Sequence, residues 1–388
     1  MKILILTGRF GMGHLKAAEA IKEELTLCRE HPGYICSARD LDIEIIDWIE
    51  YLTPHCAKYI YNGYTSLIQR STIFYNLHYK SSENRPAVQK PDLAGYIRMN
   101  QLIHEKQPDL IISVLACASG AVSYYKALSG SPLPLITCVT DITAHSEWIN
   151  SHTNAYAVGS EEVRQAFICK GVPKNQIYVT GIPVRKKFHA QNTLKNTYKI
   201  SENVRPKILL MGGGLGLMPK RLSFYQKLNC LVPAKMTIIT GKNNKLFHLL
   251  HQRFENIEVL GYVQDIEKYF LRSDLVITKP GGITTFEAVY SETPILALNP
   301  TMHQEKYNAE FICKHEIGQT LFLENDFKDA EYIARLIRNE TQINHYKKQM
   351  HRMKKAFAVC TLTSIVEQLS GALLLGGPLH DEIFSFNF

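Results

Sequence analysis

The stretch GRFGMGHLKAA, residues 8–18, follows a short apolar run at residues 2–7 with the composition of a buried strand. Gly11 and Gly13 allow positive φ and let a ligand come close to the backbone. A helix is predicted over residues 14–28, directly after these glycines. A strand, a glycine turn and a helix N-terminus with unpaired N–H groups, in that order, predict an anion-binding site at the end of a parallel strand.

His14 lies in the first turn of this predicted helix. The positive end of the helix dipole disfavours imidazolium, so a neutral ring that accepts a proton at neutral pH is expected. Such a ring is a candidate general base. The same residues also fit a tight structural turn in which the histidine only caps the helix, and spacing alone does not choose between the two.

Short apolar runs alternate with helical stretches along the whole chain, which is the pattern of parallel α/β structure. In the first half, strands are predicted at residues 2–7, 34–37, 43–47, 109–115, 134–140 and 154–158, with helices near 14–28, 92–106, 118–128 and 160–170. In the second half, strands are predicted at residues 207–212, 235–240, 257–260, 274–277, 294–298 and 319–322, with helices near 219–229, 243–253, 265–272, 283–291, 304–315 and 326–339. A chain of 388 residues is too long for one ordinary core, so two doubly wound domains in series are expected.

The segment that joins the two halves, residues 181–206, is polar and basic, as a linker should be. A helical stretch at 343–369 has no partner strand, so part of it is predicted to pack back onto the first domain. The tail, residues 371–388, is unusually apolar for a terminus. Core or dimer packing is preferred for this tail, and docking on a partner or a membrane stays open.

Composition narrows the partners only in part. The formal net charge of +8 suits a phosphorylated small molecule, an acidic lipid or a nucleic acid. Because there is no concentrated Lys/Arg stripe, a nucleic-acid-binding module is disfavoured. The nine cysteines form no CxxC pair and are expected to be reduced, mostly buried thiols of a cytosolic protein. No signal peptide or transmembrane stretch is recognised, so activity in the cytoplasm or at its membrane face is expected.

A second glycine turn occurs in TKPGGITTFE, residues 278–287, where a Pro-Gly-Gly turn ends an apolar strand and opens a helix. The N–H groups from Gly282 to Thr284 predict a cradle for a diphosphate, with Lys279 as a nearby cation. Glu287 lies farther along the helix and is suited to accept both hydroxyls of a ribose. The candidate ligand-binding residues of this segment are Lys279, Gly281, Gly282, Ile283, Thr284 and Glu287.

Two further segments complete the candidate site. The run LLMGGGLGLMP, residues 209–219, contains Gly213 and Gly214 and suits a phosphate loop or a close approach of two domains. It has neither the register of a dinucleotide-binding GxGxxG nor the GK[ST] of a P-loop, which disfavours both classes. The run HQEKYNAEF, residues 303–311, offers partners for sugar hydroxyls, although alone it would pass for an ordinary polar helix start. Its candidates are Gln304, Glu305 and Asn308.

In their order and spacing, these motifs resemble glycosyltransferase family 28, in the branch of monogalactosyldiacylglycerol synthases and processive diacylglycerol glucosyltransferases. The motifs are GxGHxxAA at 11–18, VTDITAHSEW at 139–148, VTGIPVR at 179–185, VLGYV at 259–263, TKPGGITTFEA at 278–288 and QEKYNAEF at 304–311. The resemblance implies a GT-B fold of two facing Rossmann-like domains with an interdomain cleft. It implies an acceptor domain at 1–185, a UDP-sugar domain at 186–354, and a C-terminal helix and tail at 355–388 that return to the first domain.

The resemblance also implies roles for individual residues. His14 would deprotonate or orient the acceptor hydroxyl, with Asp141 and His145 nearby in the cleft. On the donor side, the family pattern assigns uracil to Gly261, Tyr262 and Val263, the ribose to Glu287, the diphosphate to Gly282, Ile283 and Thr284, and the hexose to Gln304 and Glu305. Gly13, Gly213, Gly214, Lys279, Gly281 and Asn308 complete the expected UDP-sugar site.

The implied reaction is an inverting transfer of glucose or galactose from UDP-glucose or UDP-galactose, which is a co-substrate, with no cofactor. No metal is required, and the only DxD, at residues 40–42, is expected to be a solvated strand edge. The implied acceptor is a lipid, diacylglycerol, at the cytoplasmic face of the cell membrane. A soluble acceptor remains the alternative, and a UDP-sugar 2-epimerase is disfavoured because no convincing carboxylate set accompanies the histidine. The sequence leaves the oligomeric state open.

The segment 48–80 carries Trp48, six tyrosines and few charges, which suits a membrane interface. The family resemblance implies that this region forms the membrane-facing surface on the acceptor side. A buried helical pair or a dimer face fits it equally well. Three positions depart from the family pattern: SVLACASGA at 113–121 lacks a proline, His303 replaces a glycine, and Phe286 is bulky beside the diphosphate helix. The missing proline concerns the acceptor side. The other two departures concern the donor pocket and leave the identity of the transferred hexose open.

Overall fold

The computed structural model describes residues 1–10, 12–28, 41–70, 93–189 and 205–375, and it contains two parallel six-stranded sheets. The N-terminal sheet has the strand order β2-β1-β3-β4-β5-β6, and the C-terminal sheet has the order β12-β11-β10-β7-β8-β9. The strands of the N-terminal sheet are β1 (Lys2–Thr7), β2 (Asp42–Asp47), β3 (Leu110–Ser113), β4 (Leu135–Cys138), β5 (Ala155–Val158) and β6 (Ile177–Val179). Those of the C-terminal sheet are β7 (Lys207–Met211), β8 (Lys235–Ile239), β9 (Ile257–Leu260), β10 (Leu275–Thr278), β11 (Ile295–Leu298) and β12 (Gly318–Leu321).

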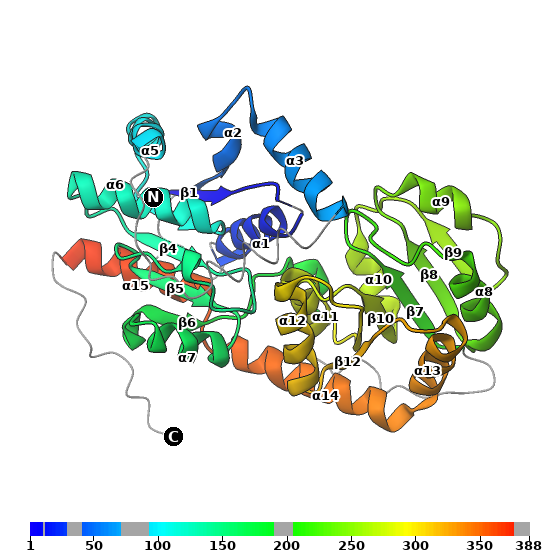
Figure 1. Cartoon of the computed structure of the whole chain (residues 1–388). Coiled ribbons are helices and arrows are strands. Elements are labelled where there is room, and N and C mark those ends of the chain that lie inside the picture. The colour runs from blue at the N-terminus through cyan, green and yellow to red at the C-terminus, as the bar shows by residue number, and fades with distance from the viewer. Residues whose placement is uncertain (11, 29–40, 71–92, 190–204, 376–388) are drawn as a thin grey trace, which may run out of the picture.

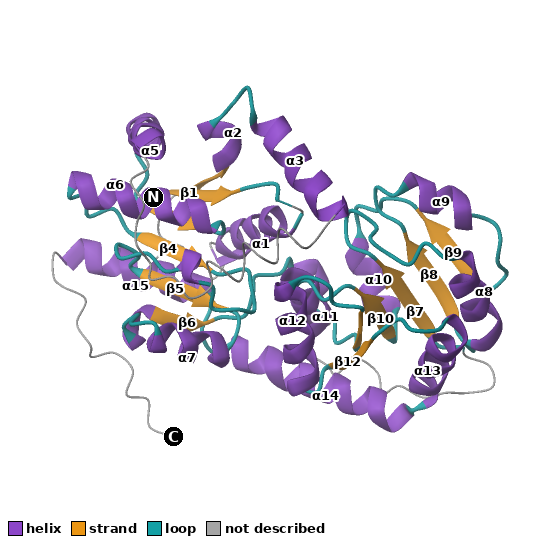
Figure 2. Cartoon of the chain, viewed as in Figure 1, coloured by secondary structure: helices purple, strands orange, loops and turns teal. Residues whose placement is uncertain are grey.

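Helices cover both faces of each sheet (Figures 1 and 2), which is why the central strands are apolar along their whole length. The helices of the N-terminal half are α1 (Gly13–Cys28), α2 (Trp48–Leu52), α3 (Ala57–Arg70), α5 (Leu93–Lys106), α6 (Ala116–Ser129) and α7 (Glu161–Cys169). Short 3₁₀ turns follow at η2 (Ser146–Trp148), η3 (Lys174–Gln176) and η4 (Lys186–Phe188). The helices of the C-terminal half are α8 (Leu222–Leu231), α9 (Asn244–Leu250), α10 (Ile266–Arg272), α11 (Gly282–Tyr290), α12 (His303–Lys314), α13 (Asp326–Arg338) and α14 (Glu340–Phe357).

The last helix, α15 (Leu362–Leu375), returns to the N-terminal half (Figure 1). Leu362, Ile365 and Val366 belong to the same hydrophobic core as β1 and α1. The partly buried carboxylate of Glu24 on α1 accepts hydrogen bonds from the N–H and the hydroxyl of Thr363, at 3.2 and 3.1 Å. The expected return of the C-terminal helix is therefore confirmed.

The order of the strands places the ligand-binding edge of each sheet. In the N-terminal sheet, the connections leave β1 and β3 in opposite directions, and in the C-terminal sheet the same holds for β7 and β10. A crevice opens between the carboxyl ends of two such strands. The glycine turns quoted above follow β1, β7 and β10, so each of them lies at one of these two crevices.

The expected doubly wound architecture is confirmed, with differences in detail. The short edge strand β6 was missed, and the helical stretch expected at 343–369 is two helices, separated near Val359, which is 88% exposed. The cysteines are not mostly buried: of the seven described, only Cys138 is buried and five are exposed. The expected strand at 34–37, Gly11, Asp40 and the apolar tail from residue 376 lie outside the described residues.

Candidate active site

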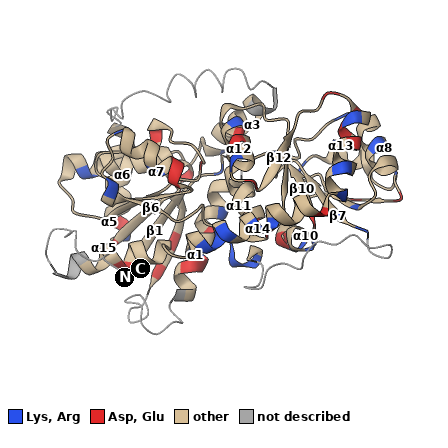
Figure 3. Ribbon diagram, turned by 90° about the horizontal axis from the view of Figure 1, so that it is seen from below, with Lys and Arg blue, Asp and Glu red and all other residues tan. Residues whose placement is uncertain are grey.

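The three glycine turns meet between the two halves of the molecule. A Cβ atom placed on Gly282, the first residue of α11, would lie 2.5 Å from the backbone oxygen of Thr140, after β4. A Cβ on Gly13 would lie 3.2 Å from the side chain of Ile283. The N-termini of α1 and α11 therefore approach each other closely, and Gly282 has no room for a side chain. Figure 3 shows basic residues around α1 and α14 at this junction.

A cavity of about 320 Å³ opens where these turns meet, a size suited to a small molecule. Residues of both halves line it. Of the residues expected from the sequence, the cavity is lined by Gly13, His14, Asp141, Gly213, Gly214, Tyr262, Val263, Gly281, Gly282, Ile283, Thr284, Glu287 and Gln304. The expected residues that do not line it are His145, Gly261, Lys279, Glu305 and Asn308. Lining residues that the sequence interpretation missed are Phe10, Met12, Lys16, Thr140, Arg185, Met211, Gln264 and Ile266.

His14 is the second residue of α1, and its ring is held by two oxygens. Its Nδ1 lies 2.9 Å from the backbone oxygen of Val114 and 3.0 Å from Oγ1 of Thr140. Because a carbonyl oxygen only accepts hydrogen bonds, Nδ1 carries the proton and Nε2 is the basic nitrogen. Burial lowers the pKa of His14, and the Asp141 carboxylate opposes this effect. Burial therefore favours the neutral ring that the sequence predicts.

Asp141 follows β4 and lies between His14 and the C-terminal half. Its Oδ2 accepts a hydrogen bond from Nε1 of Trp148 at 3.0 Å, and its Oδ1 accepts one from Nε2 of Gln304 at 3.3 Å. His145 has a different position from the one expected: it caps η2, where its Nδ1 accepts the N–H of Glu147 at 3.3 Å. We assign no step of the chemistry to His145.

Glu287 lies on the second turn of α11 and faces the cavity from the C-terminal half. Burial raises the pKa of Glu287 to about 8, while Arg185 and Lys16 oppose the shift and Glu267 adds to it. Arg185 lies 3.1 Å from Glu267 in an ion pair. Sequence signals existed for both missed cations, since Lys16 is two residues after His14 and Arg185 ends the VTGIPVR motif. The cavity thus brings together two cations, two helix N-termini and a carboxyl group that carries a proton easily.

The beginning of α12 divides the expected hexose ligands into two kinds. Gln304 lines the cavity, whereas Glu305 is buried and holds the turn before it: Oε2 accepts the N–H groups of Thr301 and Met302, at 2.9 and 3.2 Å. The other oxygen of Glu305 accepts from Nζ of Lys279 at 2.8 Å. Asn308 is also buried, and its Nδ2 donates to the backbone oxygen of Pro280 at 2.8 Å. These three residues hold the two turns in shape instead of lining the cavity.

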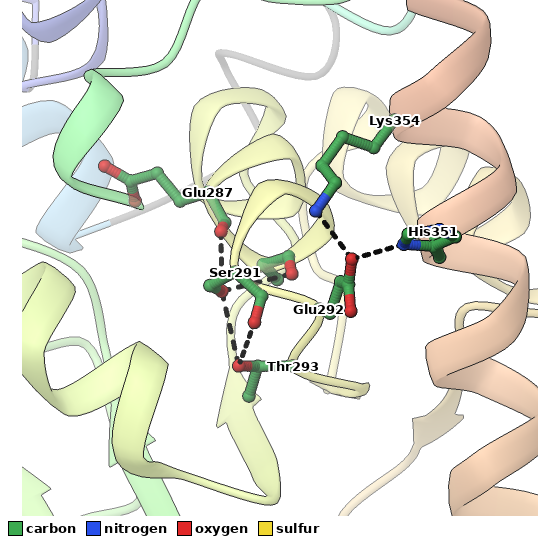
Figure 4. A network of polar contacts seen from close by, with 7 residues as sticks. Glu287, Ser291, Glu292, Thr293, His351 and Lys354 are labelled. Carbon is green, nitrogen blue, oxygen red and sulfur yellow. Dashed lines mark hydrogen bonds and ion pairs between the residues drawn. The ribbon is translucent and has the colours of Figure 1, made fainter. Parts of the chain in front are cut away.

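The far end of α11 is anchored to α14 by a buried polar network (Figure 4). Ser291 Oγ donates to the backbone oxygens of Glu287 and Ala288, at 2.8 and 3.1 Å, and satisfies carbonyls at the end of the helix. Glu292, fully buried and with a φ of 50°, accepts from Nδ1 of His351 at 2.7 Å and from Nζ of Lys354 at 2.6 Å. In Figure 4 the Glu287 carboxyl group points away from this network.

Phe286 does not line the donor side of the cavity. Its position beside the diphosphate helix had suggested that its bulk would affect the donor pocket. It is fully buried and packs against Phe311 and Phe357, with ring centroids 6.2 and 5.4 Å away. It faces the contact between α11, α12 and α14 and is absent from the cavity wall.

The aromatic segment that begins at Trp48 divides between core and surface. Trp48 is buried, and Tyr61 and Tyr64 of α3 pack edge-on against Phe10, with centroids 5.1 and 5.0 Å away. The other side of α3 exposes Tyr59, 76% accessible, together with Ile60 and Leu67. The exposed side excludes a wholly buried helical pair over the described part of this segment; residues 71–80 lie outside it.

The described residues contain neither a cluster of potential metal ligands nor a helix suited to span a membrane. No group of three or more His, Cys, Asp or Glu side chains within them could hold a metal ion. No helix of the described chain combines the length and apolar character needed to cross a membrane. Asp42, the last residue of the DxD, is the first residue of β2. Its exposed carboxylate forms an ion pair with Lys2, with Oδ2 3.9 Å from Nζ.

Comparison with known proteins agrees with this geometry. The family of monogalactosyldiacylglycerol (MGDG) synthases matches residues 14–184, and the C-terminal domain of glycosyltransferase family 28 matches residues 217–369. A processive diacylglycerol beta-glucosyltransferase of Staphylococcus carnosus is 28% identical over 91% of this chain and 89% of the relative.

Solved structures agree on the fold. A UDP-GlcNAc 2-epimerase of Neisseria meningitidis superposes with a TM-score of 0.58, at 14% identity, over 96% of this chain and 100% of that one. MurG of Acinetobacter baumannii superposes with a TM-score of 0.54, at 13% identity, over 92% and 98%. At such identities the structures support the two-domain GT-B architecture alone. Because the two family matches together span most of the sequence, the chain belongs to glycosyltransferase family 28, with an N-terminal part of the MGDG synthase type.

Proposed function

We propose that the protein transfers glucose from UDP-glucose to diacylglycerol, with inversion at the anomeric carbon, at the cytoplasmic face of the cell membrane. The observation that carries the proposal is the position of a neutral imidazole, His14, in the wall of the same cavity as the N-terminus of α11. The imidazole is suited to take the proton of a hydroxyl nucleophile, and the helix N-terminus is suited to stabilise a departing nucleoside diphosphate.

In this proposal the donor lies mainly against the C-terminal half, residues 186–354. The N–H groups at the start of α11 and the cations Lys16 and Arg185 balance the charge of the diphosphate. Glu287 accepts the hydroxyls of the ribose, and Tyr262 and Val263 contact the uracil. Gln304 hydrogen-bonds the hexose, while Lys279, Glu305 and Asn308 hold the turns that carry these groups.

The acceptor binds against the N-terminal half, residues 1–185. Its hydroxyl oxygen attacks the anomeric carbon, the bond from that carbon to the phosphate oxygen breaks, and UDP leaves with the electron pair. The proton of the hydroxyl passes to Nε2 of His14. Because the donor carries an α-linked glucose, a β-linked product follows from attack on the opposite face, in agreement with the names of the curated relatives.

The lipid acceptor is supported by the MGDG synthase match and by the exposed side of α3. Exposed Tyr59 and Ile60 are suited to the interface of a bilayer, where an aromatic ring with a polar tip is favoured. Tyr61 and Tyr64, on the other side of the same helix, contact Phe10 of the cavity wall. A lipid that enters beside α3 therefore has a short path to His14.

The test is transfer with purified protein and liposomes that contain diacylglycerol, supplied separately with UDP-glucose and UDP-galactose. We expect a monoglucosyl lipid by mass spectrometry and a β anomeric coupling by NMR, with the galactose donor slower. His14→Ala should slow transfer at least about a hundredfold, while His152→Ala, which changes an exposed histidine of the same half, should not. UDP release without a lipid product, or isomerised UDP-sugar without acceptor, would refute the proposal.

A further inference from the structure

A single side-chain amide connects the expected donor site to the residue beside the base. Gln304, at the start of α12, donates from Nε2 to Oδ1 of Asp141 at 3.3 Å, across the junction of the two halves. Both side chains line the cavity. This distance is slightly longer than the usual range of about 2.7–3.2 Å for such bonds, so breaking the contact costs little.

Asp141 in turn acts on His14. Its negative charge opposes the effect of burial on the imidazole, and its other oxygen accepts from Nε1 of Trp148 at 3.0 Å. Two donors therefore share the charge of one carboxylate. When one donor leaves, more of that charge acts on the neighbouring groups and the remaining hydrogen bond strengthens.

The other charged and titratable groups around this pair are few among the described residues. Lys16, Arg185, Glu287 and Tyr262 line the same cavity, and the hydroxyl of Tyr64 on α3 also faces the Asp141 charge. Burial raises the pKa of Tyr64 to about 12, so this phenol stays protonated across the working range.

We propose that Gln304 exchanges its partner when the donor binds: it leaves Asp141 for a hydroxyl of the hexose, and the released Asp141 carboxylate then acts more strongly on His14. The inference rests on the proposed function, because it requires a UDP-hexose in the cavity. Its consequence is a base that becomes stronger only when the leaving group is in place. Gln304 is thus a positioning residue for proton transfer as well as a sugar ligand.

Trp148 reports this exchange directly. The chain contains two tryptophans, and Trp48 lies in a different hydrophobic core, so an ¹⁵N spectrum gives two indole N–H signals, one of them an internal control. We expect the Trp148 signal to move downfield with UDP-glucose relative to UDP, while the Trp48 signal stays in place. In Gln304→Ala the Trp148 signal should already be displaced without ligand, and the two ligands should give the same shift.

The titration midpoint of His14, followed by NMR, gives a second reading. It should be higher with UDP-glucose than with UDP by about half a pH unit, as expected for a modest change in a neighbouring charge. A diphosphate is bound in both complexes, and the greater negative charge of free UDP would by itself make the midpoint of His14 higher with UDP. A higher midpoint with UDP-glucose therefore cannot come from the diphosphate charge. Asp141→Asn should lower the midpoint and remove the difference, whereas Gln264→Ala, which deletes another amide of the cavity wall, should keep it.

The outcomes separate this inference from the proposed function. If lipid is glucosylated but Trp148 and His14 do not distinguish UDP-glucose from UDP, the exchange is wrong and the proposed function stands. If Trp148 and His14 respond as expected but no lipid product forms, the exchange stands and the proposed acceptor is wrong. Equal responses in wild type and Gln304→Ala overturn the exchange whatever the product.

Discussion

Nδ1 of His14 lies 2.9 Å from the backbone oxygen of Val114, so the end of β3 determines which nitrogen of the imidazole carries the proton. The two residues follow the two strands between which the crevice of the N-terminal sheet opens. A backbone acceptor cannot be changed by substitution, and it holds the ring in one tautomer. Val114 belongs to the segment that lacks the proline of the family, yet it supplies this contact.

His14→Ala should lower kcat by about 10²–10⁴, the usual contribution of a positioned general base. The affinity for UDP should change little, because the nucleotide contacts proposed here come from the C-terminal half and from Lys16 and Arg185, and none comes from His14. Steady-state transfer rates and calorimetric titration with UDP measure the two quantities. A loss in UDP affinity that matches the loss in kcat would mean that His14 binds the donor instead of activating the acceptor.

Glu287→Gln should stabilise the protein without ligand, increasingly so as pH rises. Burial raises the pKa of Glu287 from its ordinary 4.5 to about 8, so the native protein holds this proton more tightly than the unfolded chain. The contribution of Glu287 to stability is thus complete below about pH 4.5 and is lost as pH rises through 8. The Tm of the variant minus that of the wild type should grow between pH 5 and pH 9 in thermal melts.

The same variant should bind UDP about tenfold or more weakly at pH 9, where the wild-type carboxylate accepts from the ribose. The 2′-deoxy form of UDP removes one of these hydroxyls, and the wild type should lose more affinity for it than the variant does. Equal losses in both proteins would show that Glu287 does not contact the ribose.

Some features of the candidate site could be predicted from the sequence, and others could not. The glycine turns and His14 were predictable because the fold forces the ends of particular parallel strands together. The functions of Glu305 and Asn308 were not, since both bond to backbone groups whose positions depend on the folded turns. Phe286 was misjudged because the face it covers is completed by Phe357, on a helix far along the chain.

The fold was predictable to a similar extent. The core strands stand out because they are buried on both faces, whereas β6 is an edge strand of three residues, too short to show a periodic pattern. The break between α14 and α15 depends on where the chain must turn to reach α1, and this is a property of the whole molecule.

Glu292→Ala should destabilise the protein by about 3–5 kcal/mol, the usual cost of leaving one side of a buried ion pair without its partner. The variant leaves Lys354 and His351 largely buried without the carboxylate that accepts from both. Glu316→Gln is the matched control: its partner His345 is also on α14, but both side chains are exposed, so a change within about 0.5 kcal/mol is expected. Denaturant unfolding measures both, and equal effects would contradict the anchoring of α11 by Glu292.

Gly282→Ala should separate the two halves, because its Cβ would lie 2.5 Å from the backbone oxygen of Thr140. We expect a lower Tm and weaker UDP binding. Gly281→Ala controls for the loss of a glycine, since the nearest atom to its Cβ would be 3.7 Å away, and its Tm should stay near that of the wild type. If the Tm of Gly282→Ala also stays near the wild-type value, the close approach of the two halves at this point is not needed for stability.

The exposed side of α3 gives the last prediction. Replacing Tyr59 and Ile60 by serine should reduce co-sedimentation with anionic vesicles at least tenfold, because each apolar side chain moved into the bilayer interface contributes about 1.5–3 kcal/mol when fully buried. Transfer to a short-chain, detergent-dispersed diacylglycerol should be unchanged, since neither residue lines the cavity. Leu128→Ser, at a 56% exposed site on α6, is the matched control and should leave vesicle binding as it is. Equal vesicle binding by wild type and the α3 variant would mean that another surface meets the membrane, and a loss of transfer to the dispersed lipid as well would assign α3 to acceptor binding instead.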